Sequence, residues 1–217
     1  MVRPRAAEAR REIIRACRRL DTKGHLAGAE GNVSARAGGQ QVLVTPAGRC
    51  KADLEPADLI STDLTGRTAK RRSKPSSEYA MHLAIYAARP DVGAVVHAHP
   101  VAATGFAVAR KTIPAGSLAE VPGVVGPIPL VPYQAPGTAK LAAAVAKALQ
   151  GANVALLASH GAVAVGPSIA VALQRMESLE QAARIVVAAR ILGGERTLKT
   201  AELRALERAW NAAFEGA

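Results

Sequence analysis

The sequence predicts an α/β fold in which helices cover the faces of a mixed or antiparallel sheet. Segments with apolar residues at helical spacing bracket a set of short apolar runs. Most of these runs turn back on a neighbour through a short connection, which favours a sheet with antiparallel pairs. The 217 residues are enough to bury a large core, and they predict a single domain spanning residues 1–217.

The individual elements follow from the apolar spacing and from the turn residues between the runs. A first helix at residues 6–20 places Ile13, Cys17 and Leu20 on one face. A hairpin of two strands at residues 31–36 and 41–45 follows. The remaining predicted elements are a strand at 59–63, a basic turn or hairpin at 66–74, a helix from 75 to about 90, a strand at 94–96, a helix at 100–110, a Pro- and Gly-rich connection at 113–137 with a strand at 128–131, a helix at 138–150, strands at 153–158 and 162–165, and helices at 168–192 and 200–214.

The composition limits the classes of partner. A formal charge of +11 raises the local concentration of anions, whether nucleic acid or phosphorylated metabolite. Nucleic acid is not expected, because the chain has no recognisable binding motif and its aromatic content of 3% gives a poor stacking surface. A membrane is not expected either, since no uninterrupted apolar stretch reaches the length of a span. The scattered thiols of Cys17 and Cys50 predict a cytoplasmic location.

Three histidines follow apolar runs and suggest a metal site. The run at residues 94–96 leads into His97 and His99, whose spacing puts both imidazoles on one side of a strand. His160 follows the run at residues 154–158. If both strands end at the same edge of one sheet, three neutral imidazoles converge and leave a fourth coordination position open, as in catalytic zinc sites. Spacing alone favours an ordinary polar role at a strand end over metal binding.

The segment Pro75-Ser76-Ser77-Glu78 opens the helix that ends near residue 90. Ser76 or Ser77 is predicted to be the N-cap residue, with Glu78 in the first turn. The same serine hydroxyls, free N–H groups and positive end of the helix dipole can also hold a phosphate. His82, one turn later among Ala and Tyr, is interpreted as a packing residue and is left out of the site.

Five local motifs occur in a recognisable order and spacing. They are Gly31-Asn32-Val33-Ser34, Thr45-Pro46-Ala47-Gly48, Ser76-Ser77-Glu78, His97-Ala98-His99 and Ser159-His160-Gly161-Ala162. With these motifs the chain resembles the class II aldolase/adducin family, and most closely its L-fuculose-1-phosphate aldolase branch. The resemblance covers roughly residues 6–192.

This resemblance implies a three-layer α/β sandwich whose central sheet is mainly antiparallel and covered by helices. It also implies a homotetramer with active sites at the subunit interfaces. In the family pattern, His97, His99 and His160 match the ligands of a zinc ion, for which manganese and cobalt are the alternatives.

The resemblance also implies roles for the residues around the metal. Glu78 matches the catalytic acid/base, which can also touch the resting metal. The positions that match the phosphate site are Asn32, Gly48, Ser76 and Ser77, with Ala47 standing where some relatives have a hydroxyl.

The reaction expected from the resemblance is the reversible cleavage of a ketose 1-phosphate, such as L-fuculose 1-phosphate or a similar deoxy- or methylthio-ketose. The products are dihydroxyacetone phosphate and an aldehyde, formed through an enediolate whose charge the metal stabilises. Epimerisation at C4, dehydration and decarboxylation of a sugar phosphate are alternatives at the same site. A non-catalytic, adducin-like interaction module is a further alternative, which the intact histidines disfavour.

The chain departs from the family pattern at one place. Fuculose-phosphate aldolases have a tyrosine after an Ile-Pro-Ala segment, whereas here Ile113-Pro114-Ala115 is followed by Gly-Ser-Leu-Ala-Glu. The identity of the second acid is therefore open between Glu120, Tyr133 and a residue of the C-terminal segment.

Overall fold

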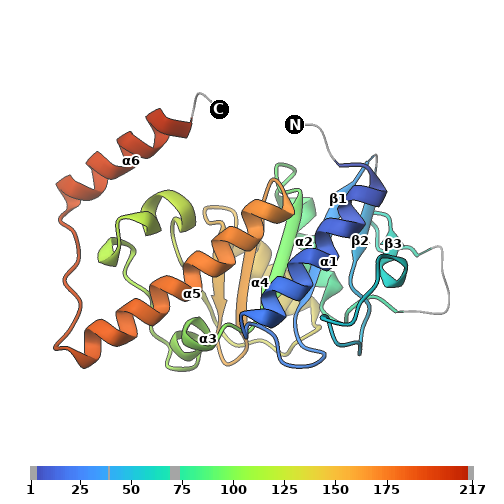
Figure 1. The fold of residues 1–217 in the computed structure, drawn as a ribbon, viewed down its shortest axis with the longest axis horizontal. Coiled ribbons are helices and arrows are strands. Elements are labelled where there is room, and N and C mark those ends of the chain that lie inside the picture. Colours follow the sequence, from blue (N-terminus) through green and yellow to red (C-terminus); the bar gives the residue numbers. More distant parts are fainter. Residues whose placement is uncertain (1–3, 39, 69–73, 215–217) are drawn as a thin grey trace.

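The computed structural model describes residues 4–38, 40–68 and 74–214, and these residues build one seven-stranded sheet (Figure 1). The strands are β1 (Asn32–Ala37), β2 (Gln41–Val44), β3 (Ile60–Thr62), β4 (Ala94–Ala98), β5 (Leu130–Val131), β6 (Val154–Leu157) and β7 (Gly161–Gly166), in the spatial order β3-β2-β1-β4-β7-β6-β5. Every pair is antiparallel except β5 with β6, which is parallel. The predicted α/β class with a mainly antiparallel sheet is confirmed.

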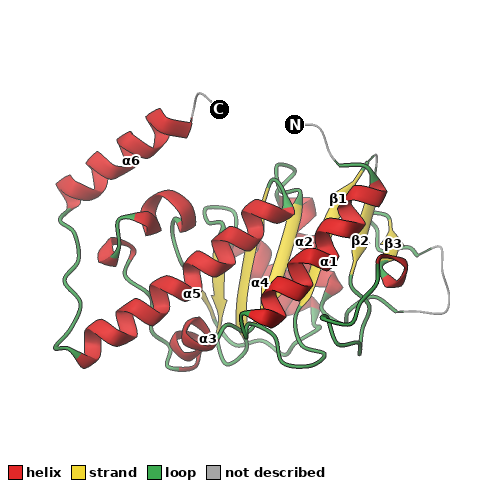
Figure 2. Ribbon diagram, viewed as in Figure 1, coloured by secondary structure: helices red, strands yellow, loops and turns green. Residues whose placement is uncertain are grey.

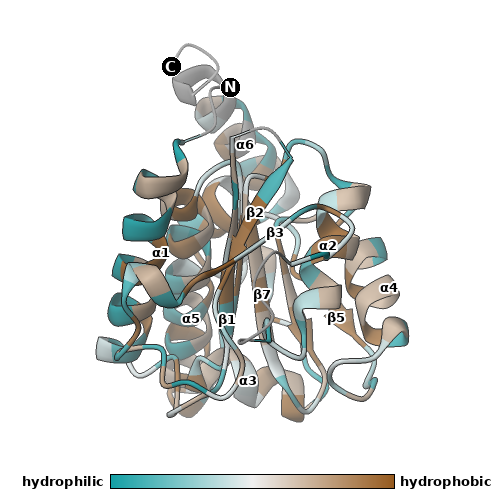
Figure 3. Ribbon diagram, turned by 90° about the vertical axis from the view of Figure 1, so that its right-hand side faces the viewer, coloured by the Kyte–Doolittle hydropathy of each residue, from teal (hydrophilic) through white to brown (hydrophobic). Residues whose placement is uncertain are grey.

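Helices cover both faces of this sheet (Figures 2 and 3). The helical elements are α1 (Ala6–Thr22), α2 (Tyr79–Ala88), α3 (Val101–Val108), α4 (Ala139–Ala148), α5 (Ile169–Ile191), α6 (Thr200–Phe214) and the short turns η1 (Pro56–Asp58), η2 (Ala115–Ser117) and η3 (Val121–Val125). Helices α1 and α5 lie on one face, and α2 and α4 lie on the other (Figure 3). The result is three layers, helix–sheet–helix.

The central strands are buried on both faces, which explains their continuous apolar sequences. In β4, Ala94 and Val96 pack in the core under α1 and α5, whereas Val95 packs in the core under α2 and α4. Because side chains alternate along a strand, His97 falls on the same face as Val95. His97 therefore faces the layer that contains α2.

The strand order also fixes where β4 and β6 end. Both strands pair antiparallel with β7, so they run in the same direction. Their carboxyl ends consequently lie at the same edge of the sheet, which is the arrangement that a three-histidine site requires. At this edge β4 runs into α3, and the β6–β7 turn carries His160.

The segment between α3 and α4 is more structured than its Pro- and Gly-rich sequence predicts. It contains η2 and η3, and η3 is a short π-helix. The indole of Trp210 in α6 lies directly against Gly123 of η3, and Leu198 N donates to Gly116 O at 2.9 Å. Helix α6 thus packs on this segment, well apart from the lower edge where β4 meets α3 (Figure 1).

The predicted basic turn at residues 66–74 is described only in part, because residues 69–73 lie outside the described residues. The described part contains an isolated bridge between Thr62 and Thr68. Within the ranges that the structure covers, no helix has both the length and the apolar composition needed to cross a membrane. Cys17 and Cys50 are free thiols, as their scattered positions predict.

Candidate active site

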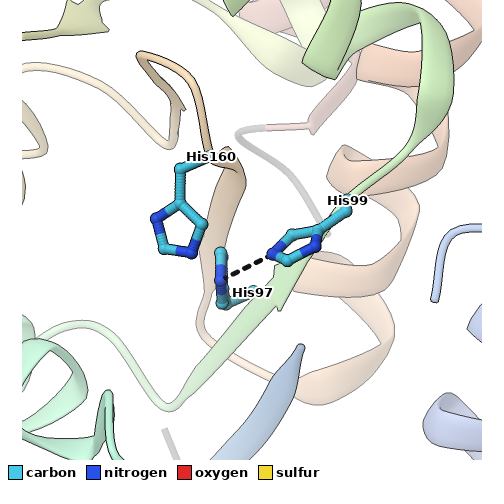
Figure 4. Close-up of side chains that lie close together, drawn as sticks. All are labelled: His97, His99 and His160. Atoms are coloured by element: carbon cyan, nitrogen blue, oxygen red, sulfur yellow. Dashed lines mark hydrogen bonds between the residues drawn. The ribbon is translucent and has the colours of Figure 1, made fainter. Parts of the chain in front are cut away.

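Three imidazoles converge at the edge of the sheet where β4 and β6 end (Figure 4). His97, His99 and His160 each offer one ring nitrogen, and these atoms all lie within 4.8 Å of one another. His97 is fully buried, and the other two rings are half-buried. The structure therefore brings together the three histidines that the sequence singles out, and their role as metal ligands stays a prediction.

The β6–β7 turn holds His160 close to the end of β4. His160 N donates to Leu157 O at 3.0 Å, which closes the turn. The next residue, Gly161, leaves no room for a side chain, because a Cβ there would lie 2.4 Å from His99 Cδ2 and 2.7 Å from Ala98 O. The glycine thus allows the turn to approach His99 closely.

Hydrogen bonds fix the tautomer of two of the rings. His97 Nδ1 lies 2.9 Å from Ala162 O, and His99 Nδ1 lies 2.9 Å from Glu30 Oε2. A carbonyl or carboxylate oxygen only accepts, so Nδ1 must carry the proton in both rings. With Nδ1 protonated, a neutral ring has a lone pair on Nε2 that can bind a cation. His97 Nε2 also lies 3.0 Å from Glu78 Oε2, and a proton or a cation between these two atoms makes this contact favourable.

The two Nε2 atoms face each other at a distance of 3.2 Å. Two lone pairs at this distance repel each other unless a proton or a metal ion lies near both. The third ring, that of His160, has its centroid 4.7 Å from that of His97 and 5.2 Å from that of His99. This donor set, three imidazole nitrogens at one point, fits a divalent transition metal such as zinc.

The carboxylate of Glu78 lies beside the histidine nitrogens. Glu78 Oε2 is 3.0 Å from His97 Nε2, and Oε1 is 3.3 Å from His160 Nε2. Asn32 Nδ2 donates to Glu78 Oε2 at 3.3 Å. The predicted acid/base is therefore next to the predicted ligands, although it lies 19 residues before His97 in the sequence.

Burial and neighbouring charges act on these groups in opposite directions. Burial raises the pKa of Glu78, but contacts with His97, His160 and Asn32 outweigh it and lower this pKa to about 2. Burial lowers the pKa of His160 to about 4 and also lowers that of His99. The carboxylate is thus ionised, and these two rings are neutral, at physiological pH.

The residues predicted to hold a phosphate come from two loops that lie side by side. Ser76 N donates to Thr45 O at 3.2 Å, and Pro46 and Pro75 form an isolated bridge. Gly48 and Ser77 are exposed, whereas Asn32 is buried next to Glu78. The two loops are therefore adjacent, and the phosphate site stays a prediction.

The predicted capping of α2 is wrong in detail. The helix begins at Tyr79, and Glu78, not Ser76 or Ser77, occupies the N-cap position without a side-chain capping bond. Ser76 Oγ accepts from Glu78 N at 3.4 Å. The carboxylate of Glu78 is thereby left free to lie against the histidines and Asn32.

A buried polar ladder connects β1 to α2 behind Glu78. Alternate residues of the strand face residues four apart on the helix; the three rungs are Asn32–Glu78, Ser34–His82 and Arg36–Tyr86. The Ser34 hydroxyl lies 2.7 Å from His82 Nδ1 and 2.8 Å from the Tyr86 hydroxyl oxygen. Burial lowers the pKa of His82 to about 3, so this ring is neutral. His82 serves the ladder and not the metal site, which agrees with its interpretation as a packing residue.

Removing the Ser34 hydroxyl is expected to destabilise the fold. Ser34→Ala leaves His82 Nδ1 and the Tyr86 hydroxyl buried without this partner, and this costs about 1–3 kcal/mol of unfolding free energy. Urea denaturation measures the change. The matched control is Ser61→Ala, whose hydroxyl accepts from Gln41 at a half-buried position and whose loss is expected to cost less. Equal stability losses in the two variants would contradict the ladder.

Comparison with known proteins identifies the family. The family model described as "Class II Aldolase and Adducin N-terminal domain" matches residues 11–187. The chain belongs to this family.

Members of the class II aldolase family with different reactions are similar to this chain. The 5-methylthioribulose-1-phosphate/5-deoxyribulose-1-phosphate aldolase of Rhodospirillum rubrum is 38% identical over 174 residues, covering 80% of this chain and 78% of that protein. The 3-oxo-tetronate 4-phosphate decarboxylase of Pectobacterium atrosepticum is 32% identical over 182 residues, covering 82% and 83%. A solved L-fuculose 1-phosphate aldolase has a TM-score of 0.86 at 29% identity, covering 94% of this chain and 96% of that chain.

Neither of the two named candidates for a second acid makes a polar contact with the described residues of the site. Glu120 and Tyr133 are both exposed. Within the described part of the chain, no hydrogen bond or ion pair joins either residue to the three histidines or to Glu78. Both residues stay candidates only.

Sequence reasoning missed two groups that support the histidines. One is the carboxylate of Glu30 on His99 Nδ1, and the other is the Ala162 carbonyl on His97 Nδ1. Every residue has a backbone carbonyl, so the sequence cannot indicate that the carbonyl of Ala162 contacts His97. Glu30 directly precedes the Gly31-Asn32 motif, but it lies in a turn outside β1, and no local signal links it to His99.

Proposed function

We propose that this protein is a metal-dependent aldolase that reversibly cleaves a ketose 1-phosphate to dihydroxyacetone phosphate and an aldehyde. The observation that carries the proposal is the convergence of three histidine nitrogens within 4.8 Å of one another, with the Glu78 carboxylate 3.0 Å from one of them. Membership of the class II aldolase and adducin family supports it.

In this proposal His97, His99 and His160 hold the metal, with zinc as the first choice and manganese or cobalt as alternatives. A bound divalent cation would stabilise negative charge on the carbonyl oxygen of the ketose. The protons on Nδ1 of His97 and His99 leave Nε2 to bind that ion.

Glu78 is proposed as the acid/base that handles the proton on carbon. As the C3–C4 bond breaks, the C4 hydroxyl gives its proton to water and becomes the aldehyde, and the electron pair of the bond stays on C3. The ionised Glu78 carboxylate takes up a proton from solvent and delivers it to C3. Asn32 orients the carboxylate through its bond to Oε2. Gly48, Ser76 and Ser77 of the two adjacent loops are proposed to bind the phosphate together with Asn32.

The substrate class proposed is a deoxy- or methylthio-ketose 1-phosphate, or L-fuculose 1-phosphate. The aldolase of Rhodospirillum rubrum, whose name gives it 5-methylthioribulose 1-phosphate and 5-deoxyribulose 1-phosphate, supports this class. The homotetramer with interfacial active sites and the cytoplasmic location stay predictions from the sequence.

The main alternative keeps the site and changes the reaction. The similarity to a 3-oxo-tetronate 4-phosphate decarboxylase favours loss of carbon dioxide from a phosphorylated keto acid as the second candidate. Decarboxylation also leaves an electron pair on a carbon next to a carbonyl, so the same histidines and Glu78 would serve it. Epimerisation and dehydration are further alternatives, because they too can proceed through negative charge next to a carbonyl group that the same site would stabilise.

Condensation assays separate these candidates. The zinc-loaded protein is incubated with dihydroxyacetone phosphate and acetaldehyde, methylthioacetaldehyde or lactaldehyde, and new ketose phosphates are detected by mass spectrometry. We expect a product with at least one aldehyde, loss of activity after chelation, and recovery on adding zinc. No Schiff-base lysine is involved, so borohydride should not trap the protein on its substrate.

A different result would favour the decarboxylase. Absence of condensation with every aldehyde, combined with release of carbon dioxide from a 3-oxo-tetronate 4-phosphate, would replace the aldolase proposal with the decarboxylase.

A further inference from the structure

We propose that Glu30 is a positioning residue that fixes the orientation and tautomer of His99 for metal binding. This inference rests on the metal site of the proposed function. The carboxylate of Glu30 lies 2.9 Å from His99 Nδ1, and the Glu30 side chain is 50% exposed. It thus approaches the ring from the solvent side and occupies the nitrogen that does not face the other histidines.

A turn just before β1 places Glu30 beside His99. The antiparallel pairing of β1 with β4 ends with Asn32 as the partner of His97. Before this pair, Glu30 N donates to Ala27 O at 3.1 Å, which closes a turn. From this turn the Glu30 carboxylate reaches His99 Nδ1 at 2.9 Å.

Gly31 allows the chain to turn between Glu30 and β1 while it stays close to the end of β4. It has a φ of +64°, and a Cβ there would lie 2.4 Å from Leu26 Cδ2 and 2.7 Å from His97 O. A hydrogen bond from His99 N to His25 O at 2.9 Å holds the neighbouring loop against the same edge. The position of Glu30 is therefore set by the backbone on both sides.

The three histidines differ in what supports them. His97 Nδ1 bonds to the backbone carbonyl of Ala162, and His160 Nδ1 has no partner among the residues described. Among these three described rings, only His99 has an ionisable side chain as the partner of Nδ1. An anionic acceptor on Nδ1–H keeps that proton in place and increases the electron density at Nε2, so it strengthens the ring as a ligand.

The test measures metal affinity rather than turnover. Metal-free protein is titrated with zinc against a chromogenic chelator, for the wild type, Glu30→Ala, Glu30→Gln and the control Glu8→Gln. Glu8 is an exposed residue in the first turn of α1, so its substitution removes the same charge elsewhere. Zinc affinity is expected to fall by about 10- to 100-fold in Glu30→Ala, the usual range for such supporting partners.

Glu30→Gln distinguishes positioning from a general charge effect. Its amide oxygen can still accept from His99 Nδ1–H, so its affinity is expected to lie between those of the wild type and Glu30→Ala. Imidazole ¹⁵N chemical shifts of metal-free Glu30→Ala should show that His99 no longer keeps its proton on Nδ1. Thermal unfolding of the metal-free variants should stay close to the wild type, because Glu30 is half exposed.

Zinc affinity of Glu30→Ala within twofold of the wild type would overturn the inference. So would an equal loss in Glu30→Ala and Glu8→Gln. If the wild type itself bound no zinc, the metal site of the proposed function would fail instead, and the two failures are thereby distinguishable.

Discussion

Glu78→Gln is expected to keep its metal and lose most of its turnover. Glutamine has nearly the same shape and can still accept from Asn32 Nδ2, but it cannot take up or deliver a proton. Positioned acid–base groups contribute about 10²–10⁴-fold to rate, so kcat should fall by that factor. The release of dihydroxyacetone phosphate in a coupled assay gives the rate, and elemental analysis by mass spectrometry gives the zinc content.

His97→Ala is the companion variant and should behave differently. It removes a fully buried ring that contributes Nε2 to the cluster, so metal and turnover should be lost together. Full zinc occupancy in His97→Ala would contradict the assignment of the ligands. A Glu78→Gln enzyme that kept wild-type kcat would likewise remove Glu78 from the proton transfer.

Gly161→Ala is expected to disrupt the metal centre without touching a ligand. The added Cβ would lie 2.4 Å from His99 Cδ2 and 2.7 Å from Ala98 O, closer than real contacts allow. Either the His99 ring or the β6–β7 turn that carries His160 must move. Because a displaced ligand no longer points at the shared position, zinc affinity should fall by at least tenfold, which corresponds to about 1.4 kcal/mol.

The matched control is Gly151→Ala, in the loop before β6. A Cβ at this position would meet no atom within 4 Å, so zinc affinity and stability should stay near the wild type. Titration with zinc gives the affinity of both variants, and urea denaturation gives their stability. Wild-type zinc affinity in Gly161→Ala would show that the turn has more freedom than its contacts indicate.

The convergence of the histidines could be predicted from the sequence on one condition, that both strands end at the same edge of one sheet. Two apolar runs ending in histidine need only run parallel to each other in one sheet, and β4 and β6 do so on either side of β7. The side-chain period of two then puts His97 and His99 on one side. The period is a local rule, whereas the shared direction of β4 and β6 depends on the sheet topology, which the sequence could state only as a condition.

The burial of β1 could not be predicted in the same way. Its alternating sequence, with Asn32, Ser34 and Arg36 on one side, is typical of a strand with one solvent-exposed face. Yet these three residues are only 2%, 0% and 6% exposed. The alternation of side chains along β1 identifies which residues share a face. It does not show that α2 covers this face and offers polar groups to it.

The N-cap of α2 and the role of Glu30 were missed for a related reason. Both depend on contacts between segments that are far apart in the chain, namely Glu78 with His97 and Glu30 with His99. Local preference favours a serine cap at residues 76–77, whereas the tertiary contacts of Glu78 decide where the helix begins.

The polar ladder has a mechanical consequence for the position of Glu78. Two residues of strand span about 6.6 Å and four residues of helix about 6.0 Å, so the three rungs can form together only in one alignment of the two elements. Sliding α2 by one residue, about 1.5 Å, would break the Ser34–His82 bond as well as the Asn32–Glu78 bond. The ladder therefore opposes sliding of α2 along β1, and this resistance keeps the Glu78 carboxylate at one distance from the histidine nitrogens.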